Sequence, residues 1–178
     1  GMGLAMAEQL CTPNHTLLCI SRGSSDALET LAKKNGTTLL QWQADLAQPE
    51  AVANKLMAWL QTQEGSTFSQ ASLINNAGVI GHLGPIEQAT ASSVQQALAI
   101  NLAAPILLTQ VFLQATRAWP AKRKVLQISS GLGRRAMAAS AVYCATKAGL
   151  DHFSRCAALD EALLSNPAQM VSIAPGVI

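Results

Sequence analysis

Two side chains of the segment Tyr143-Cys144-Ala145-Thr146-Lys147 could do acid–base chemistry together. Tyr143 is the only tyrosine in the chain, and Lys147 follows it by four residues in a segment of helical periodicity. Side chains at this spacing lie side by side on one face of a helix. A phenol normally ionises at about pH 10, and a neighbouring ammonium favours the ionised form. The pair therefore predicts a proton donor, although a half-buried tyrosine beside a solvated lysine would have the same spacing.

Two further polar positions could assist such a pair. Ser130 ends a predicted strand ahead of Tyr143, where a hydroxyl can donate to a substrate carbonyl, and its neighbour Ser129 is the less favoured candidate. Asn101 falls in the middle of a long predicted helix, where an amide is a mediocre helix former. It has either a functional role or a place on a solvated face. A serine hydrolase is disfavoured, because the chain has no G-x-S-x-G segment and no histidine suitably placed for Ser130.

Short apolar runs alternate with longer segments of helical spacing, which is typical of a parallel sheet covered by helices. The pattern predicts an α/β fold with one domain spanning residues 1–178. The expected strands are His15–Ser21, Thr37–Trp42, Ala71–Asn75, Lys124–Ser129 and Met170–Ala174. The expected helices are Gly3–Cys11, Ser25–Lys34, Pro49–Thr62, Ala91–Arg117 and Ser140–Leu164.

Composition narrows the possible partners. The chain has 178 residues, 49% hydrophobic and 12% charged, with a formal net charge of +2. This charge is too small for the basic surface that nucleic acid requires, and the longest apolar run, 98–108, is interrupted by Asn101 and Pro105. We expect neither nucleic-acid nor membrane binding. The four cysteines lack C-x-x-C spacing and are expected to be reduced and buried, and the three scattered histidines predict no metal site.

Several short motifs occur together in an order that resembles the short-chain dehydrogenase/reductase family. They are Gly1-Met2-Gly3, Asn75-Asn76-Ala77-Gly78, Asn101, Ser130, Tyr143-x-x-x-Lys147 and Pro175-Gly176. The resemblance spans the whole chain and implies a Rossmann-type, doubly wound parallel sheet in three α/β/α layers. It also implies that the family's first strand and C-terminal part are absent, so we expect a sequence trimmed at both ends. Gly1-Met2 could instead be an expression scar.

The same resemblance implies a dinucleotide cofactor. No acidic residue ends the second family strand, whereas Ser21 and Arg22 could bind a 2′-phosphate, so NADP (NADPH) is expected. Arg22 as a plain surface residue, and Asp45 as a plain helix cap, are the alternatives. The cofactor-binding residues implied are Gly1, Met2, Gly3, Ser21, Arg22, Asp45, Leu46, Asn76, Ala77, Gly78, Tyr143, Lys147, Pro175, Gly176 and Ile178.

The resemblance implies hydride transfer between NADPH and a carbonyl carbon. Tyr143 would be the proton donor, Lys147 its support, Ser130 the carbonyl partner and Asn101 part of the proton supply. The strings around Asn76, Asn101 and Tyr143 look similar to the sepiapterin reductase and benzil reductase branch, which reduces dicarbonyl compounds.

Other readings remain open. The substrate could be a ketone, a diketone or a 3-oxoacyl thioester, and a non-catalytic NADPH-sensing or scaffolding protein is the alternative of another class. Family members commonly pair through the two long helices, so we expect a cytoplasmic homodimer or homotetramer.

Overall fold

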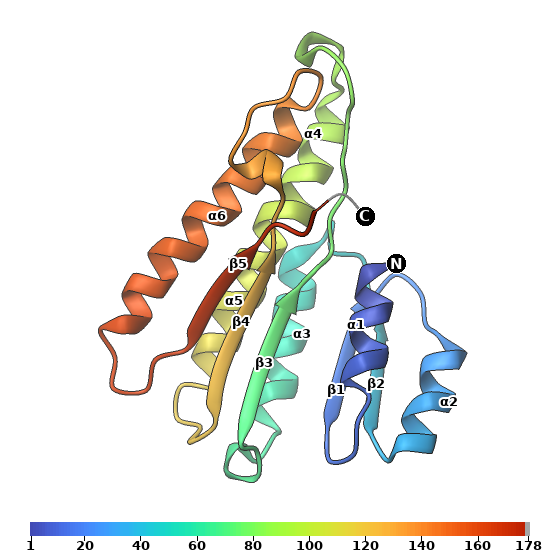
Figure 1. Cartoon of the computed structure of the whole chain (residues 1–178), viewed down its shortest axis with the longest axis vertical. Helices are drawn as coiled ribbons and strands as arrows, with labels where there is room; N and C mark the ends of the chain where they lie inside the picture. Colours follow the sequence, from blue (N-terminus) through green and yellow to red (C-terminus); the bar gives the residue numbers. More distant parts are fainter. Residues whose placement is uncertain (177–178) are drawn as a thin grey trace. The chain divides into compact units, whose positions relative to one another are not determined.

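Helices and strands alternate along the computed structural model, which describes residues 1–176 (Figure 1). The chain divides into two compact units, the first covering Gly1–Leu46 and the second beginning at Ala47. The strands form a two-stranded sheet in the first unit and a three-stranded sheet in the second. The predicted α/β class with parallel strands is confirmed. The single domain over residues 1–178 stays a prediction.

The first unit is a pair of parallel strands with two helices. Its elements in chain order are α1 (Met2–Leu10), β1 (Thr16–Ser21), α2 (Asp26–Asn35) and β2 (Thr38–Gln43). The two strands pair in parallel, with Thr16 opposite Thr38. Ser25 caps α2 by accepting a hydrogen bond from the Leu28 amide. Gly36 ends the helix in the left-handed conformation, which glycine adopts without a Cβ clash.

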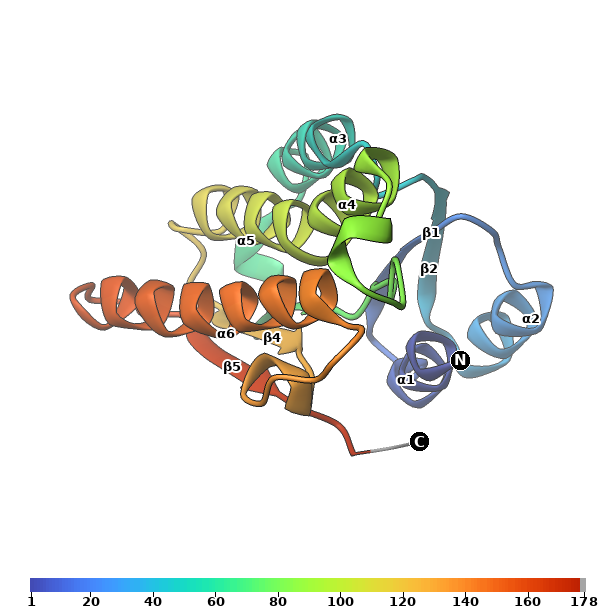
Figure 2. The same ribbon diagram turned by 90° about the horizontal axis from the view of Figure 1, so that it is seen from above.

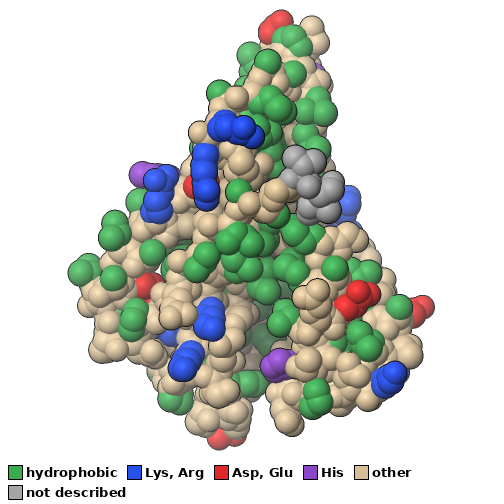
Figure 3. Space-filling view, viewed as in Figure 1, with side chains coloured by type: hydrophobic (Ala, Val, Ile, Leu, Met, Phe, Trp, Pro, Cys, Tyr) green, Lys and Arg blue, Asp and Glu red, His purple; other side chains and the backbone are tan. Residues whose placement is uncertain are grey.

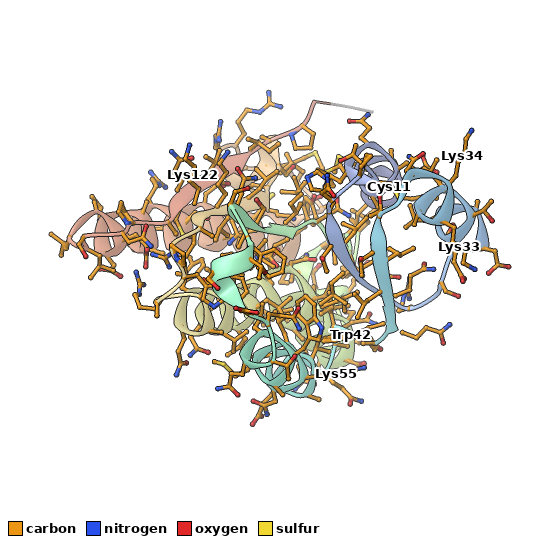
Figure 4. The ribbon with its side chains drawn as sticks, turned by 90° about the horizontal axis from the view of Figure 1, so that it is seen from below. Cys11, Lys33, Lys34, Trp42, Lys55 and Lys122 are labelled. Carbon is orange, nitrogen blue, oxygen red and sulfur yellow. The ribbon has the colours of Figure 1, made fainter. Side chains whose placement is uncertain are left out.

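The core of the first unit is small and apolar. Ala7, Cys11, Leu28 and Ala32 are its buried members. Cys11 is fully buried in it, while Lys33 lies on α2 and points away from it (Figure 4). All four cysteines are free thiols. The prediction that they are buried is confirmed for Cys11, whereas Cys19 and Cys144 are partly exposed and Cys156 is exposed.

The second unit is built on three parallel strands. Its elements are α3 (Pro49–Gln61), β3 (Gln70–Asn75), α4 (Ala91–Leu98), α5 (Ala104–Ala115), β4 (Lys122–Ile128), α6 (Ala141–Ala162) and β5 (Gln169–Ile173). The strand order is β3-β4-β5, so β4 is central. Helices α5 and α6 cover one face of this sheet (Figure 2). Hydrophobic side chains gather on the face of this sheet that Figure 3 shows, and Val171 and Ile173 of β5 are among the exposed hydrophobic residues.

The helices and strands of the structure match the predicted residue ranges closely, with one difference. The segment expected as one helix, Ala91–Arg117, is two α-helices joined by a π-helical turn at Ala99–Ala103. Pro105 explains the interruption, because it has no amide hydrogen to donate to the carbonyl of Asn101 four residues earlier. The amide of Ala104 donates to the carbonyl of Ala99, five residues back. Such turns are often found at functional sites.

The stretch Ala91–Ala115 is the one helical segment of the described chain that is long and apolar enough to cross a membrane. Half of its most apolar part is buried inside the protein. Its residues Leu108 and Phe112 belong to the core, where α5 packs against α3. Because a core helix has the same composition, this segment gives little support to a membrane span.

A buried ionic network fastens the end of α6 to the start of β4. The carboxylate of Glu161 accepts hydrogen bonds from Arg117, Arg123 and the amide of Ala168. Arg123 is fully buried and also donates to the carbonyl of Asn166. Burial by itself would raise the pKa of Glu161, but the hydrogen bonds from Arg117 and the Ala168 amide, together with the charges of Arg117 and Arg123, outweigh it and lower this pKa. The network thus stabilises the fold only while Glu161 is ionised.

We expect the unfolding free energy to fall at acid pH because of this carboxylate. Its pKa is lower in the folded than in the unfolded chain, so its contribution is complete above the unfolded value of about 4.3 and is lost as pH falls through the lower folded value. Glu161→Gln should cost about 2 kcal/mol at neutral pH and flatten this acid dependence. Urea unfolding at several pH values measures both effects. An unchanged acid slope in the variant would contradict the assignment.

Candidate active site

Two adjacent strands of the second unit end in the polar residues predicted from the sequence. Asn76, Ala77 and Gly78 follow β3, and Ser129 and Ser130 follow β4. Since β3 and β4 pair in parallel, both segments leave the sheet at its carboxyl edge. Ligands of open α/β sheets bind at this edge. The structure therefore brings these motifs to the side of the sheet where cofactor chemistry takes place in such folds.

Asn101 is held by the segment that follows β3. Its amide nitrogen donates to the Val79 carbonyl at 2.7 Å, and its amide oxygen accepts from the Val79 amide at 2.8 Å. The side chain is fully buried, so the alternative of a solvated helix face is excluded. Asn101 thus fixes the backbone that immediately follows Gly78.

Lys147 crosses from α6 to the end of β4. Its ammonium group donates to the carbonyl of Ile128 at 2.9 Å, two residues before Ser130. It also lies 5.8 Å from the ring centre of Tyr143, one turn earlier on the same helix. Burial lowers the pKa of Lys147, and the negative charge of Asp151 opposes that shift. The predicted helical pairing of Tyr143 with Lys147 is therefore present, and it is buried at the lysine end.

The side chains of Asn101 and Lys147 both approach the backbone of Gly78. A Cβ built on Gly78 would lie 3.5 Å from the Asn101 amide oxygen and 3.5 Å from the Lys147 nitrogen. The backbone of Gly78 therefore lies against both groups, and the missing side chain leaves room above them. Asn101, Lys147 and Gly78 come from three different segments, yet the fold places them in one cluster.

The two neighbouring serines differ in exposure. Ser130 is partly exposed, and its hydroxyl accepts a hydrogen bond from the Leu132 amide at 3.2 Å. Ser129 is buried. A hydroxyl that polarises a substrate carbonyl must be reachable by the substrate, which favours Ser130.

The turn after Ser130 packs tightly on α6. A Cβ on Gly133 would come within 3.0 Å of both the Asp151 carboxylate and the Lys147 carbonyl. By contrast, the nearest atom to a Cβ on Gly131 is the Arg135 guanidinium, at 3.8 Å. Glycine at 133 is therefore required by the close approach of the turn to the helix, whereas Gly131 has space.

We predict that Gly133→Ala destabilises the fold by about 1–3 kcal/mol, the usual cost of overpacking. It should also lower turnover, because the turn that carries Ser130 must move away from α6. Gly131→Ala is the matched control and should leave both quantities close to those of the parent. Thermal unfolding and initial rates measure the two effects. Equal losses in the two variants would show that chain stiffness, rather than the contact with α6, matters.

The second unit can accommodate a dinucleotide at this edge. Among the unpartnered buried polar atoms of the described residues is the Asn76 side-chain oxygen. Asn76 follows the carboxyl end of β3 and precedes the bare backbone of Gly78 by two residues. A ligand rich in hydroxyl groups can donate a hydrogen bond to such an atom. The residues present therefore fit the ribose and nicotinamide portion of the cofactor that the fold family implies.

The first unit offers a separate set of residues suited to phosphate. Gly1 begins α1 without a side-chain cap, so the amides at the helix N-terminus remain available to an anion. Ser21 ends β1 and Arg22 follows it, both exposed, and Asp45 and Leu46 follow β2. A guanidinium at this position can donate charge-assisted hydrogen bonds to a phosphate.

Two predicted cofactor residues lie at the far end of the described chain. Pro175 and Gly176 follow β5, which pairs with β4 at the same sheet edge. Ile178 lies outside the described residues. Met2 and Gly3 form the first turn of α1.

Sequence reasoning missed Thr146 as part of the cluster. Its hydroxyl donates to the Tyr143 carbonyl at 2.8 Å and accepts from the Asn101 amide at 3.2 Å. Thr146 thus links the helix turn carrying Tyr143 to Asn101. Its position between Tyr143 and Lys147 in a helical segment was the only available signal, because the partner Asn101 is distant in sequence.

Comparison with known proteins gives matches over the full length of the chain. The family model described as short chain dehydrogenase matches residues 1–178. A benzil reductase ((S)-benzoin forming) from Bacillus cereus is 33% identical over 178 residues, which are all of this chain and 72% of that protein. These matches agree with the resemblance read from the motifs.

Solved structures agree with the sequence comparisons. A short-chain dehydrogenase/reductase from Burkholderia vietnamiensis is 39% identical, with a TM-score of 0.80, and the match covers 100% of this chain and 79% of that one. A metagenomic short-chain oxidoreductase in complex with NADP is 28% identical, with a TM-score of 0.85 and coverage of 100% and 77%. With the strand-edge motifs and the Tyr143 and Lys147 pairing, these matches show that the chain belongs to the short chain dehydrogenase family.

Proposed function

We propose that this oxidoreductase is an NADPH-dependent carbonyl reductase acting on a ketone or diketone. The observation that carries the proposal is the buried cluster in which Lys147 reaches β4 beside Gly78 and Asn101, with Tyr143 one turn away. The similar benzil reductase reduces a diketone by its name, which supports this substrate class. The similar structure in complex with NADP supports the choice of cofactor.

Bound NADPH would supply a hydride to the carbonyl carbon. In the first unit, Gly1, Met2 and Gly3 would hold phosphate through helix amides, Ser21 and Arg22 the 2′-phosphate, and Asp45 and Leu46 the adenine. In the second unit, Lys147 and the segment Asn76, Ala77 and Gly78 would bind the ribose and nicotinamide. Pro175 and Gly176 would orient the nicotinamide ring.

Tyr143 would donate its phenolic proton to the carbonyl oxygen as negative charge develops there. The Lys147 ammonium, 5.8 Å from the ring centre, would stabilise the phenolate left behind. Ser130 would hold the substrate oxygen through its hydroxyl. Asn101, fixed by Val79 and Thr146, would keep the proton supply in place behind Lys147.

The proposal is tested by mixing the protein with NADPH and a panel of benzil, aryl ketones and acetoacetyl thioesters. Faster loss of NADPH absorbance with diketones than with thioesters would support the diketone class. Preference for the thioester would favour a 3-oxoacyl thioester reductase instead. NADPH binding without any turnover would favour a sensing or scaffolding protein.

Assembly and location follow the same family resemblance. We propose a cytoplasmic protein that pairs, as a homodimer or homotetramer, through the helical segments Ala91–Arg117 and Ser140–Leu164. Light scattering on the purified protein measures its mass in solution, and a monomer would refute the assembly.

A further inference from the structure

Asp151 is a buried acid on the catalytic helix that the proposed reaction does not use. It follows Lys147 by four residues and Tyr143 by eight, so all three share one face of α6. Only 6% of the residue is exposed. A carboxylate is rarely buried without a partner, because losing water costs it several kcal/mol. The burial of the Asp151 carboxylate therefore requires an explanation.

The Asp151 carboxylate joins three elements around Lys147. One oxygen accepts a hydrogen bond from the Ser172 hydroxyl on β5. The other lies 3.6 Å from the Arg134 guanidinium, on the loop after Ser130, and has no hydrogen bond of its own among the described residues. The same oxygen is the one that a Cβ on Gly133 would approach within 3.0 Å. The acid therefore lies where β5, the Ser130 turn and the Lys147 turn meet.

The charges around Lys147 are unequal in their exposure to water. Tyr143 and Asp151 face it from α6, Arg134 lies on the loop after Ser130, and β4 and Asn101 contribute only neutral groups. The Arg134 side chain is 61% exposed, so water screens its charge, whereas the Asp151 side chain is 8% exposed and is screened little. Of the two charges, the carboxylate of Asp151 is therefore the one that water screens little, and it opposes the effect of burial on Lys147.

We propose that Asp151 is a positioning residue of the carbonyl-reduction site, whose charge keeps Lys147 in its ammonium form and whose contacts hold the Ser130 turn and β5 against α6. This inference rests on the proposed function for its catalytic meaning. The effect of the Asp151 charge on the ionisation of Lys147 does not depend on that function. Burial pulls the pKa of Lys147 down, and the negative charge of Asp151 opposes this shift.

The test follows the ionisation of Lys147 directly. The chain is labelled with carbon-13 in its lysine side chains, and the Lys147 signal is assigned with Lys147→Arg and followed by NMR as pH rises. Asp151→Asn keeps an oxygen for Ser172 but removes the charge. We expect it to lower the Lys147 titration midpoint by about one pH unit. Asp160→Asn, which removes the same charge from an exposed position on α6, should leave the midpoint unchanged.

Asp151→Ser provides a second neutral variant at the same position, with a smaller side chain. It removes the same charge, so the Lys147 midpoint should fall as in Asp151→Asn. An unchanged midpoint in Asp151→Asn overturns the proposal. If Asp151→Asn does not fold, an unchanged midpoint in Asp151→Ser overturns it.

Turnover separates this inference from the proposed function. In an active enzyme, kcat/KM should begin to fall at a lower alkaline pH in Asp151→Asn than in the parent. A loss of folded protein would lower kcat/KM at every pH and would not shift this fall. If no carbonyl compound is reduced but the Lys147 midpoint still falls, the proposed function fails and the electrostatic role of Asp151 stands. If turnover is normal and neither the midpoint nor the alkaline fall in kcat/KM moves, the role of Asp151 fails alone.

Discussion

Tyr143→Phe is expected to reduce the rate of carbonyl reduction by about 10³-fold or more, while the dissociation constant for NADPH stays close to that of the parent. The substitution removes one hydroxyl and keeps the ring, so the packing of α6 changes little. The ring continues to lie beside the Lys147 amine. What disappears is the proton that the developing alkoxide would take. The effect should therefore appear in kcat rather than in cofactor binding.

Stopped-flow measurement of NADPH loss, together with fluorescence titration of NADPH, checks both halves of this expectation. Ser129→Ala is a useful companion variant, because Ser129 is buried and is not assigned to the substrate oxygen. Ser130→Ala should lower kcat more than Ser129→Ala does. Loss of NADPH binding in Tyr143→Phe would mean damage to the fold instead. Turnover close to that of the parent would remove Tyr143 from the mechanism.

Arg22→Asp is expected to reverse the preference between the two dinucleotides. Arg22 is exposed and directly follows Ser21, the last residue of β1. A guanidinium binds a phosphate through charge-assisted hydrogen bonds, and an aspartate at the same position would repel it and accept from a ribose hydroxyl. The ratio of NADPH to NADH affinity should fall by on the order of 10²–10³, given about 1.5–3 kcal/mol for the lost bonds plus the added repulsion.

Binding titrations with both cofactors, at two salt concentrations, measure this ratio. The NADPH affinity of the parent should weaken with salt more than its NADH affinity, because the extra phosphate adds charge. Arg135→Asp changes an exposed arginine elsewhere in the chain and should leave the ratio unchanged. Equal loss of both cofactors in Arg22→Asp would show that Arg22 does not distinguish them.

The element order was readable from the sequence because local patterns determine it. Strand β1 was expected at His15–Ser21 and lies at Thr16–Ser21, and α3 was expected to begin at Pro49 and does so. Apolar periodicity and proline at a helix start act within a few residues, so no knowledge of partners is needed. The interruption at Ala99–Ala103 was missed, although Pro105 signalled it. The apolar periodicity continues through this segment, so the pattern gives no sign of the hydrogen bond that Pro105 cannot donate.

The contacts that organise the site could not be read in the same way. Asn101 pairs with the Val79 backbone, Lys147 with the Ile128 carbonyl and Asp151 with Ser172, each across a long stretch of chain. Such pairs depend on how strands and helices pack, and residue types alone do not specify them. The sequence identified Tyr143, Lys147, Asn101 and Ser130 as candidates through spacing and family resemblance. It gave no sign that Asp151 would be buried beside Lys147.

The most direct test of the central claim is to follow the hydride itself. The protein is given benzil and NADPH that carries deuterium at the transferable position of the nicotinamide, and the product is examined by mass spectrometry. We expect one deuterium on the new alcohol carbon, formed by the parent and almost absent with Tyr143→Phe. A benzoin product without deuterium, or deuterium transfer that proceeds equally in Tyr143→Phe, would contradict the account.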